Sequence, residues 1–122
     1  MRVFVTGANA FIGRHVVFQL ARAGFEVIAS YRTADARLDA LRAFDNVTLA
    51  PLDVSQAAEF SRFPGRIDAI VHIAAVSQAA GISLDALLAC NVMGTKNVID
   101  YGLSAGARRI VFASSLSVYG RI

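Results

Sequence analysis

The stretch TGANAFIG, residues 6–13, follows an apolar run at residues 3–5 and precedes a segment with helical periodicity, so it lies where a strand turns into a helix. Such a turn can bind a pyrophosphate, because free backbone N–H groups and the helix dipole both favour an anion there. Gly7 suits a sharp turn, and Gly13 suits close packing of the helix on the strand. Ala10 stands where a loop of the form T-G-x-x-G-x-x-G carries its middle glycine.

The side chain of Ala10 adds only one methyl group to this loop. With a negative φ at this position, we expect the methyl group to lower the affinity for a phosphate without abolishing binding. The loop follows a strand and opens a βαβ unit, which favours a ligand site over the alternative of a tight turn without a ligand. The sequence therefore predicts a cofactor-binding loop that includes Gly7, Ala10, Phe11, Ile12 and Gly13.

Beyond the loop, short β-rich runs alternate with longer helical patterns, which is typical of a parallel sheet with crossover helices. The runs are at residues 3–5, 27–29, 47–49, 69–73 and 110–113. Hydrophobic residues make up 56% of the chain and charged residues 17%, which indicates a sheet covered on both faces. We predict one α/β domain over residues 1–122, a Rossmann-like doubly wound parallel sheet of order 3-2-1-4-5, incomplete at the C-terminus.

Four helices are expected between these strands. The first follows the loop and ends at Ala23-Gly24, and a weaker one includes Leu38, Leu41 and Arg42. Ser55 is expected to cap a short helix at residues 56–60. The longest begins near Ser83 and ends before Gly102, and Gly94 inside it predicts close backbone packing.

Composition narrows the classes of function. The net charge is +3, but the arginines are scattered, so we expect no nucleic-acid partner. No apolar run approaches the roughly 20 residues needed to cross a bilayer, and we expect a cytoplasmic protein. Cys90 is interpreted as a core residue and His72 as a strand histidine at the edge of the core, with no metal site. A homodimer is left open.

The end of the second predicted strand bears on the choice of cofactor. An acidic residue about 20 residues past the loop binds the ribose 2′-hydroxyl of NAD in dinucleotide folds. Here the chain reads Ser30-Tyr31-Arg32. Arg32 offers a planar cation to a 2′-phosphate, and Tyr31 can lie beside the adenine. We therefore expect NADP, with NAD as the alternative; a solvated surface arginine is the other interpretation of Arg32.

Five motifs in order resemble the extended short-chain dehydrogenase/reductase family, the NAD(P)-dependent epimerases, dehydratases and reductases. They are Thr6-Gly7 to Gly13, Leu52-Asp53-Val54, Val71-His72-Ile73-Ala74-Ala75, the segment at residues 91–98 and the segment at residues 113–120. Each motif alone is weak evidence. Their order along the whole chain is specific.

The resemblance implies roles for matching positions. Asp53 would bind the adenine amino group and Val54 would pack on the ring, while Ala74 and Ala75 would let the ribose and phosphate approach the backbone. Asn91 would bridge its helix to the fourth strand. Ser115 matches the catalytic serine, whose hydroxyl can hydrogen-bond a substrate oxygen, with Ser114 as the neighbouring candidate. Asp53 could also simply begin a turn.

The family's general acid/base is a tyrosine in a Tyr-x-x-x-Lys motif, and Tyr31, Tyr101 and Tyr119 lack a lysine at that spacing. We therefore expect the N-terminal portion of a longer enzyme, without its substrate domain and inactive alone. The whole enzyme would be an oxidoreductase or epimerase/dehydratase acting on a carbonyl or hydroxyl of a small molecule such as a nucleotide-sugar. The alternatives are a non-catalytic NADP(H)-binding sensor and an interaction module.

Overall fold

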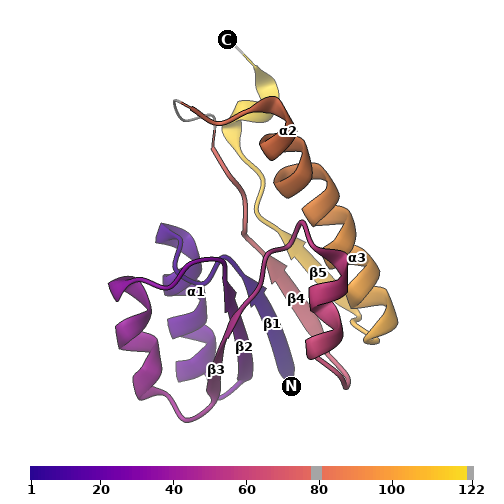
Figure 1. The fold of residues 1–122 in the computed structure, drawn as a ribbon. Helices are drawn as coiled ribbons and strands as arrows, with labels where there is room; N and C mark the ends of the chain where they lie inside the picture. The colour runs from indigo at the N-terminus through magenta and orange to yellow at the C-terminus, as the bar shows by residue number, and fades with distance from the viewer. Residues whose placement is uncertain (78–80, 121–122) are drawn as a thin grey trace.

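A computed structural model of the chain describes residues 1–77 and 81–120. Five strands form one parallel sheet in the order β3-β2-β1-β4-β5 (Figure 1). They are β1 (Arg2–Thr6), β2 (Glu26–Tyr31), β3 (Val47–Pro51), β4 (Ala69–His72) and β5 (Arg109–Phe112). The predicted α/β class and strand order are confirmed.

The central strand β1 pairs with β2 on one side and with β4 on the other. In this register Thr6, the last residue of β1, lies opposite Ser30 of β2 and opposite His72 of β4. The carboxyl ends of all three strands therefore meet at one edge of the sheet. The strand order reverses here, and in open α/β sheets ligands bind at this switch point.

Each face of the sheet carries its own core because side chains alternate along a strand. Val3 and Val5 of β1 pack with Val17 of α1 (Phe11–Arg22) on one face. Phe4 is fully buried on the other face, with its ring centroid 5.1 Å from that of Phe63 and 5.2 Å from that of Tyr101. Figure 1 shows α1 and the long helix α3 on opposite sides of the sheet, as expected for a doubly wound fold.

The first helix ends as the sequence predicts. The backbone N–H of Ala23 donates to the carbonyl of Gln19, and that of Gly24 donates to Ala21. Gly24 has a φ of 89°, a left-handed conformation that glycine adopts without a steric penalty.

The two helices predicted next are both 3-10 helices. Leu38 and Leu41 are buried in η1 (Ala36–Ala43); their spacing of three residues matches one 3-10 turn and aims both at the core. The expected cap at Ser55 is wrong. Gln56 occupies the N-cap of η2 (Ala57–Arg62), and the Ser55 hydroxyl turns back to donate to Asp53. A further 3-10 turn, η4 (Leu116–Tyr119), follows β5.

The longest helix begins as predicted, and Ser83 caps it by accepting a hydrogen bond from the backbone N–H of Ala86. It comprises α2 (Leu84–Leu87), a π-helical turn η3 (Leu88–Met93) and α3 (Gly94–Ser104). The predicted end before Gly102 is too early, because the helix continues to Ser104. No helix among the described residues combines the length and apolar content that a membrane crossing requires.

Gly94 explains how this helix lies close to the segment after β3. A Cβ atom at this position would lie 2.6 Å from Cγ2 of Val54. The close packing predicted from a glycine inside the helix is confirmed, and it brings the helix against Val54.

Candidate functional site

The loop after β1 has the tight geometry predicted for it. Gly7 has a φ of 76°, and a Cβ atom there would lie 2.8 Å from the backbone nitrogen of Ala74. A Cβ atom on Gly13 would lie 1.8 Å from the carbonyl oxygen of Gly7. Both positions therefore require glycine, one for the turn against the chain after β4 and the other for the approach of α1 to the loop.

Ala10 fits the loop without backbone strain, because its φ is −68° and its ψ is 160°. It is the N-cap of α1, and its methyl side chain makes no hydrogen bond to the helix. The N–H groups of residues 11–13 precede the first intrahelical bond, from the Arg14 N–H to the Ala10 carbonyl. These orphan donors, with the positive end of the helix dipole, suit an anion. Phe11 and Ile12 are exposed at this turn.

A hollow at the carboxyl ends of the strands brings together most of the predicted cofactor residues. It is lined by the loop after β1, by the chain at and beyond the ends of β2, β3 and β4, and by one residue each from η1 and from the long helix. Its predicted members are Gly7, Ala10, Tyr31, Arg32, Asp53, Val54, Ala74 and Ala75. Segments that are far apart in sequence thus converge on one site because their strands end at the same edge.

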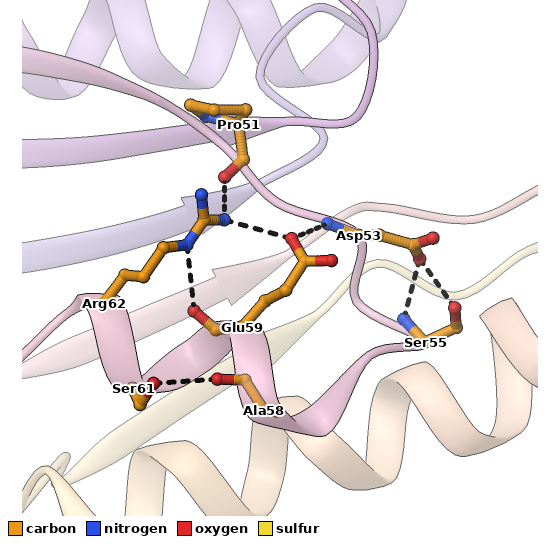
Figure 2. A network of polar contacts seen from close by, with 7 residues as sticks. All are labelled: Pro51, Asp53, Ser55, Ala58, Glu59, Ser61 and Arg62. Atoms are coloured by element: carbon orange, nitrogen blue, oxygen red, sulfur yellow. Dashed lines mark hydrogen bonds and ion pairs between the residues drawn. The ribbon is translucent and has the colours of Figure 1, made fainter.

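Asp53 is held in a defined orientation (Figure 2). One of its carboxylate oxygens accepts hydrogen bonds from the Ser55 backbone N–H at 3.0 Å and from the Ser55 hydroxyl at 2.7 Å. Its backbone N–H donates to Glu59, which pairs with Arg62. Asp53 therefore begins a turn, which was the second interpretation of this residue in the sequence analysis. The turn also fixes the Asp53 carboxylate at the hollow. Its second oxygen makes none of the hydrogen bonds drawn in Figure 2.

The basic end of the hollow contains a residue that the sequence analysis missed. Arg37 lines it together with Tyr31 and Arg32. The Arg37 guanidinium lies 2.6 Å from the carboxylate of Asp35, and this hydrogen bond lowers the pKa of Asp35. Asn9 joins the loop to this region by donating to the Thr33 carbonyl at 2.7 Å. The one signal for Arg37 in the sequence is its position shortly after Arg32.

Asn91 bridges the long helix to the chain after β4, at Val76, and not to the strand itself as the resemblance implied. Its side-chain amide donates to the Val76 carbonyl and its side-chain oxygen accepts from the Val76 N–H, both at 2.9 Å. Cys90, expected in the core, is only partly buried and lines the hollow beside Ala75. Burial raises the pKa of its thiol, and the charge of Asp53 adds to that effect.

The hollow continues toward the serine motif. Ala75 also borders two adjoining hollows, each lined by Asn91 and Ser115. The Ser115 hydroxyl accepts a hydrogen bond from the Ser117 N–H at 3.1 Å, and Ser114 borders one of the two. The three hollows share Ala75 and are together called the groove below; Arg32 lines the first of them and Ser115 lines the other two. Among residues 1–77 and 81–120, no group of His, Cys, Asp and Glu side chains could hold a metal ion.

Comparison with known proteins agrees with this arrangement. UDP-glucose 4-epimerase 4 from Oryza sativa subsp. japonica is 34% identical over 131 residues, covering 97% of this chain and 35% of that protein. The crystal structure of a DesIV double mutant (dTDP-glucose 4,6-dehydratase) from Streptomyces venezuelae with NAD and DAU bound matches with a TM-score of 0.87 and 33% identity, covering 100% of this chain and 42% of that one. The crystal structure of yeast methylglyoxal/isovaleraldehyde reductase Gre2 complexed with NADPH matches with a TM-score of 0.81 and 26% identity, covering 96% of this chain and 38% of that one.

The chain spans about a third of the length of the curated relatives it matches first. The sequence profile of the NAD dependent epimerase/dehydratase family matches residues 3–122. The resemblance drawn from the five motifs is confirmed. With its glycine loop, Asp53 and Ala74-Ala75 around one hollow, the chain belongs to the NAD dependent epimerase/dehydratase family and forms that family's dinucleotide-binding region.

Proposed function

We propose that the chain binds NADP(H) in the groove between Arg32 and Ser115. One observation carries the proposal: the glycine loop, the Asp53-Val54 turn and the small residues Ala74-Ala75 line the same hollow at the switch point of the sheet. The orphan N–H groups at the start of α1 would hold the pyrophosphate. Asp53 would accept from the adenine amino group, Val54 would pack on the ring, and Ala74-Ala75 would leave room for the ribose and phosphate.

The activity of the whole protein belongs to the same proposal. We place it among oxidoreductases or epimerase/dehydratases that act on a carbonyl or hydroxyl of a small molecule, with nucleotide-sugars favoured by the names of two of the similar proteins. The bound dinucleotide would supply hydride transfer. Ser115, at the far end of the groove, would donate a hydrogen bond to the substrate oxygen as charge develops on it.

The preference for NADP over NAD rests on charge at the basic end of the groove. Arg32 and Arg37 both line it, and the carboxylate of Asp35 is engaged by Arg37. A 2′-phosphate would therefore meet the Arg32 guanidinium and the part of the Arg37 guanidinium that does not bond Asp35, and guanidinium groups bind phosphate through paired hydrogen bonds. The 2′-hydroxyl of NAD would find no comparable gain from them.

Replacing Arg32 with alanine is expected to weaken NADPH binding by about tenfold to a hundredfold and NADH binding by less than about twofold, because a charge-assisted hydrogen bond contributes about 1.5–3 kcal/mol. Fluorescence titration of both cofactors measures this. Arg42→Ala is the matched control, since Arg42 is exposed and pairs with Asp39 in η1. Equal losses for both cofactors would refute the NADP assignment, and no binding of either at millimolar concentration would refute the proposed function.

Replacing Ala10 with glycine is expected to strengthen NADPH binding by about twofold to fivefold, because it removes the methyl group from the approach to the pyrophosphate. The gain is small because Ala10 already has a negative φ. The same substitution adds conformational freedom to the unfolded chain and should lower stability by about 0.5–1 kcal/mol. Titration and urea denaturation of the one variant separate the two effects; weaker binding would contradict the steric account.

A cytoplasmic location and a homodimer complete the proposal. The absence of a membrane-crossing helix among the described residues is compatible with the first. Exposed apolar side chains on the long helix, including Leu88, Val92 and Leu103, offer surface for a second copy of the chain. Light scattering of the purified chain measures its molar mass in solution and so tests the homodimer.

A further inference from the structure

A buried histidine lies next to the glycine loop at residues 6–13. His72, the last residue of β4, is 2% exposed. Its Nδ1 atom lies 2.7 Å from the Thr6 hydroxyl on the neighbouring strand, and its Nε2 atom lies 2.9 Å from the Thr95 hydroxyl on α3. The ring centroid of Phe112 on β5 is 5.7 Å away. The imidazole therefore joins three elements of the fold, and the expectation of a histidine at the edge of the core understated its burial.

The hydrogen bonds of the two threonines determine where the imidazole proton lies. The Thr95 hydroxyl donates its proton to the Asn91 carbonyl at 2.7 Å, so toward His72 it can only accept. Nε2 must therefore carry a proton. The Thr6 hydroxyl accepts from the backbone N–H groups of Ile73 and Ala74 at 3.0 and 3.1 Å, which occupies both of its lone pairs. Its proton is then directed to Nδ1, which must be unprotonated.

This chain of bonds reaches three parts of the groove. Thr6 precedes the Gly7 turn and holds the N–H of Ala74, which lines the hollow. Thr95 holds the carbonyl of Asn91 in the π-helical turn, and the Asn91 side chain in turn fixes Val76. We propose that His72, as the neutral Nε2–H tautomer, is a positioning residue that locks the phosphate loop, the chain after β4 and the Asn91 turn into the arrangement that binds the dinucleotide. The proposal rests on the proposed function.

Protonation of His72 would break this arrangement. A proton on Nδ1 would face the Thr6 oxygen, whose lone pairs already accept two backbone N–H groups. The side chains that face the ring are Thr6 from β1, Thr95 from α3 and Phe112 from β5, and none of the three is charged. Burial lowers the pKa of His72 below its ordinary value of 6.5.

The sign of the pH effect follows from this lowered pKa. Below pH 6.5 the unfolded chain binds a proton at this position more readily than the folded chain does. Stability is therefore full above about pH 6.5 and falls as the pH drops from there to the folded pKa. Dinucleotide affinity should fall in the same direction, because a charged ring releases Thr6.

Nitrogen-15 NMR of the imidazole rings tests the tautomer directly. The chain has only two histidines, so two ring systems appear. At about pH 7.5 we expect His72 to be neutral with a protonated Nε2 and an unprotonated Nδ1, and the exposed His15 supplies the second ring for comparison. A charged His72 ring, or a proton on Nδ1, would overturn the proposal whether or not the chain binds a dinucleotide.

Calorimetric titration with NADP⁺ tests the positioning role. Thr95→Val removes the bond to Nε2 and is expected to weaken binding about tenfold, while Thr95→Ser keeps the hydroxyl and should recover most of the affinity. His72→Asn keeps an acceptor near the Nδ1 position but cannot titrate. It should therefore lose the fall in affinity below about pH 6.5 that wild type and the control His15→Asn share.

The outcomes separate this proposal from the function on which it rests. If wild type and Thr95→Val bind NADP⁺ equally well, the positioning role of His72 is refuted and the proposed function is not. The same conclusion follows if His72→Asn keeps the wild-type pH dependence. If wild type does not bind NADP⁺, the proposed function falls and the positioning role falls with it. The NMR measurement uses wild-type protein, so it still decides the tautomer if a variant fails to fold.

Discussion

Replacing Gly13 with alanine is expected to destabilise the folded chain strongly. The added Cβ atom would lie 1.8 Å from the Gly7 carbonyl oxygen and 2.8 Å from the Gly7 carbonyl carbon. Both are backbone atoms of the tight loop, so no side-chain rotation can relieve the overlap. Helix α1 would have to separate from the loop, which would open the core around Val17. We expect a loss of more than about 4 kcal/mol, a large part of the about 5–15 kcal/mol that stabilises a typical domain.

The comparison for Gly13→Ala is Gly24→Ala at the other end of the same helix. Gly24 has a φ of 89°, and no described atom lies within 4 Å of the position of a Cβ atom there. Alanine at this position should cost only the about 1–2 kcal/mol of a left-handed conformation. Urea denaturation followed by far-UV circular dichroism measures both variants. If the two lose similar amounts of stability, the contact between Gly13 and Gly7 is not what requires the glycine.

The sheet could be predicted from the sequence because its signals are local. Each strand is a short β-rich run, and the alternation of these runs with helical patterns leaves few topologies once crossovers are right-handed. The loop at residues 6–13 was predictable for the same reason. The type of the two short helices was not, because Leu38 and Leu41 fit an α-helical face nearly as well as a 3-10 turn. At Ser55 two local bonds compete, and the hydroxyl binds Asp53 instead of capping η2.

The parts of the site that escaped prediction depend on contacts between distant segments. Cys90 looked like a core residue because its helix is apolar, and it borders the groove because Gly94 lets that helix lie close against Val54. The partners of His72 could not be read from the sequence either. They follow from the register that sets Thr6 opposite His72 and from the packing that brings Thr95 to Nε2.

Replacing Phe4 with alanine is expected to destabilise the chain by about 3–5 kcal/mol, the usual cost of removing a buried phenylalanine ring. Phe4 is fully buried in the central strand, and its ring packs edge-on against Phe63 and at a tilt against Tyr101. Those two aromatic residues come from the segment after η2 and from α3, so the cavity would loosen the whole second face of the sheet. Urea denaturation of the variant measures the loss.

Phe11→Ala is the matched comparison, since it removes the same ring from a position that is 70% exposed. Its ring lies 5.5 Å from the ring of His15, and the guanidinium of Arg14 lies 5.4 Å from its centroid. Exposed contacts of these kinds contribute about 0.5–1 kcal/mol each, so the variant should stay folded. Phe11 is also a predicted cofactor residue at the start of α1, so Phe11→Ala should weaken NADP⁺ binding several-fold while Phe4→Ala acts through stability alone. Unchanged affinity in folded Phe11→Ala would remove its side chain from the binding site and leave its backbone N–H as its only contribution there.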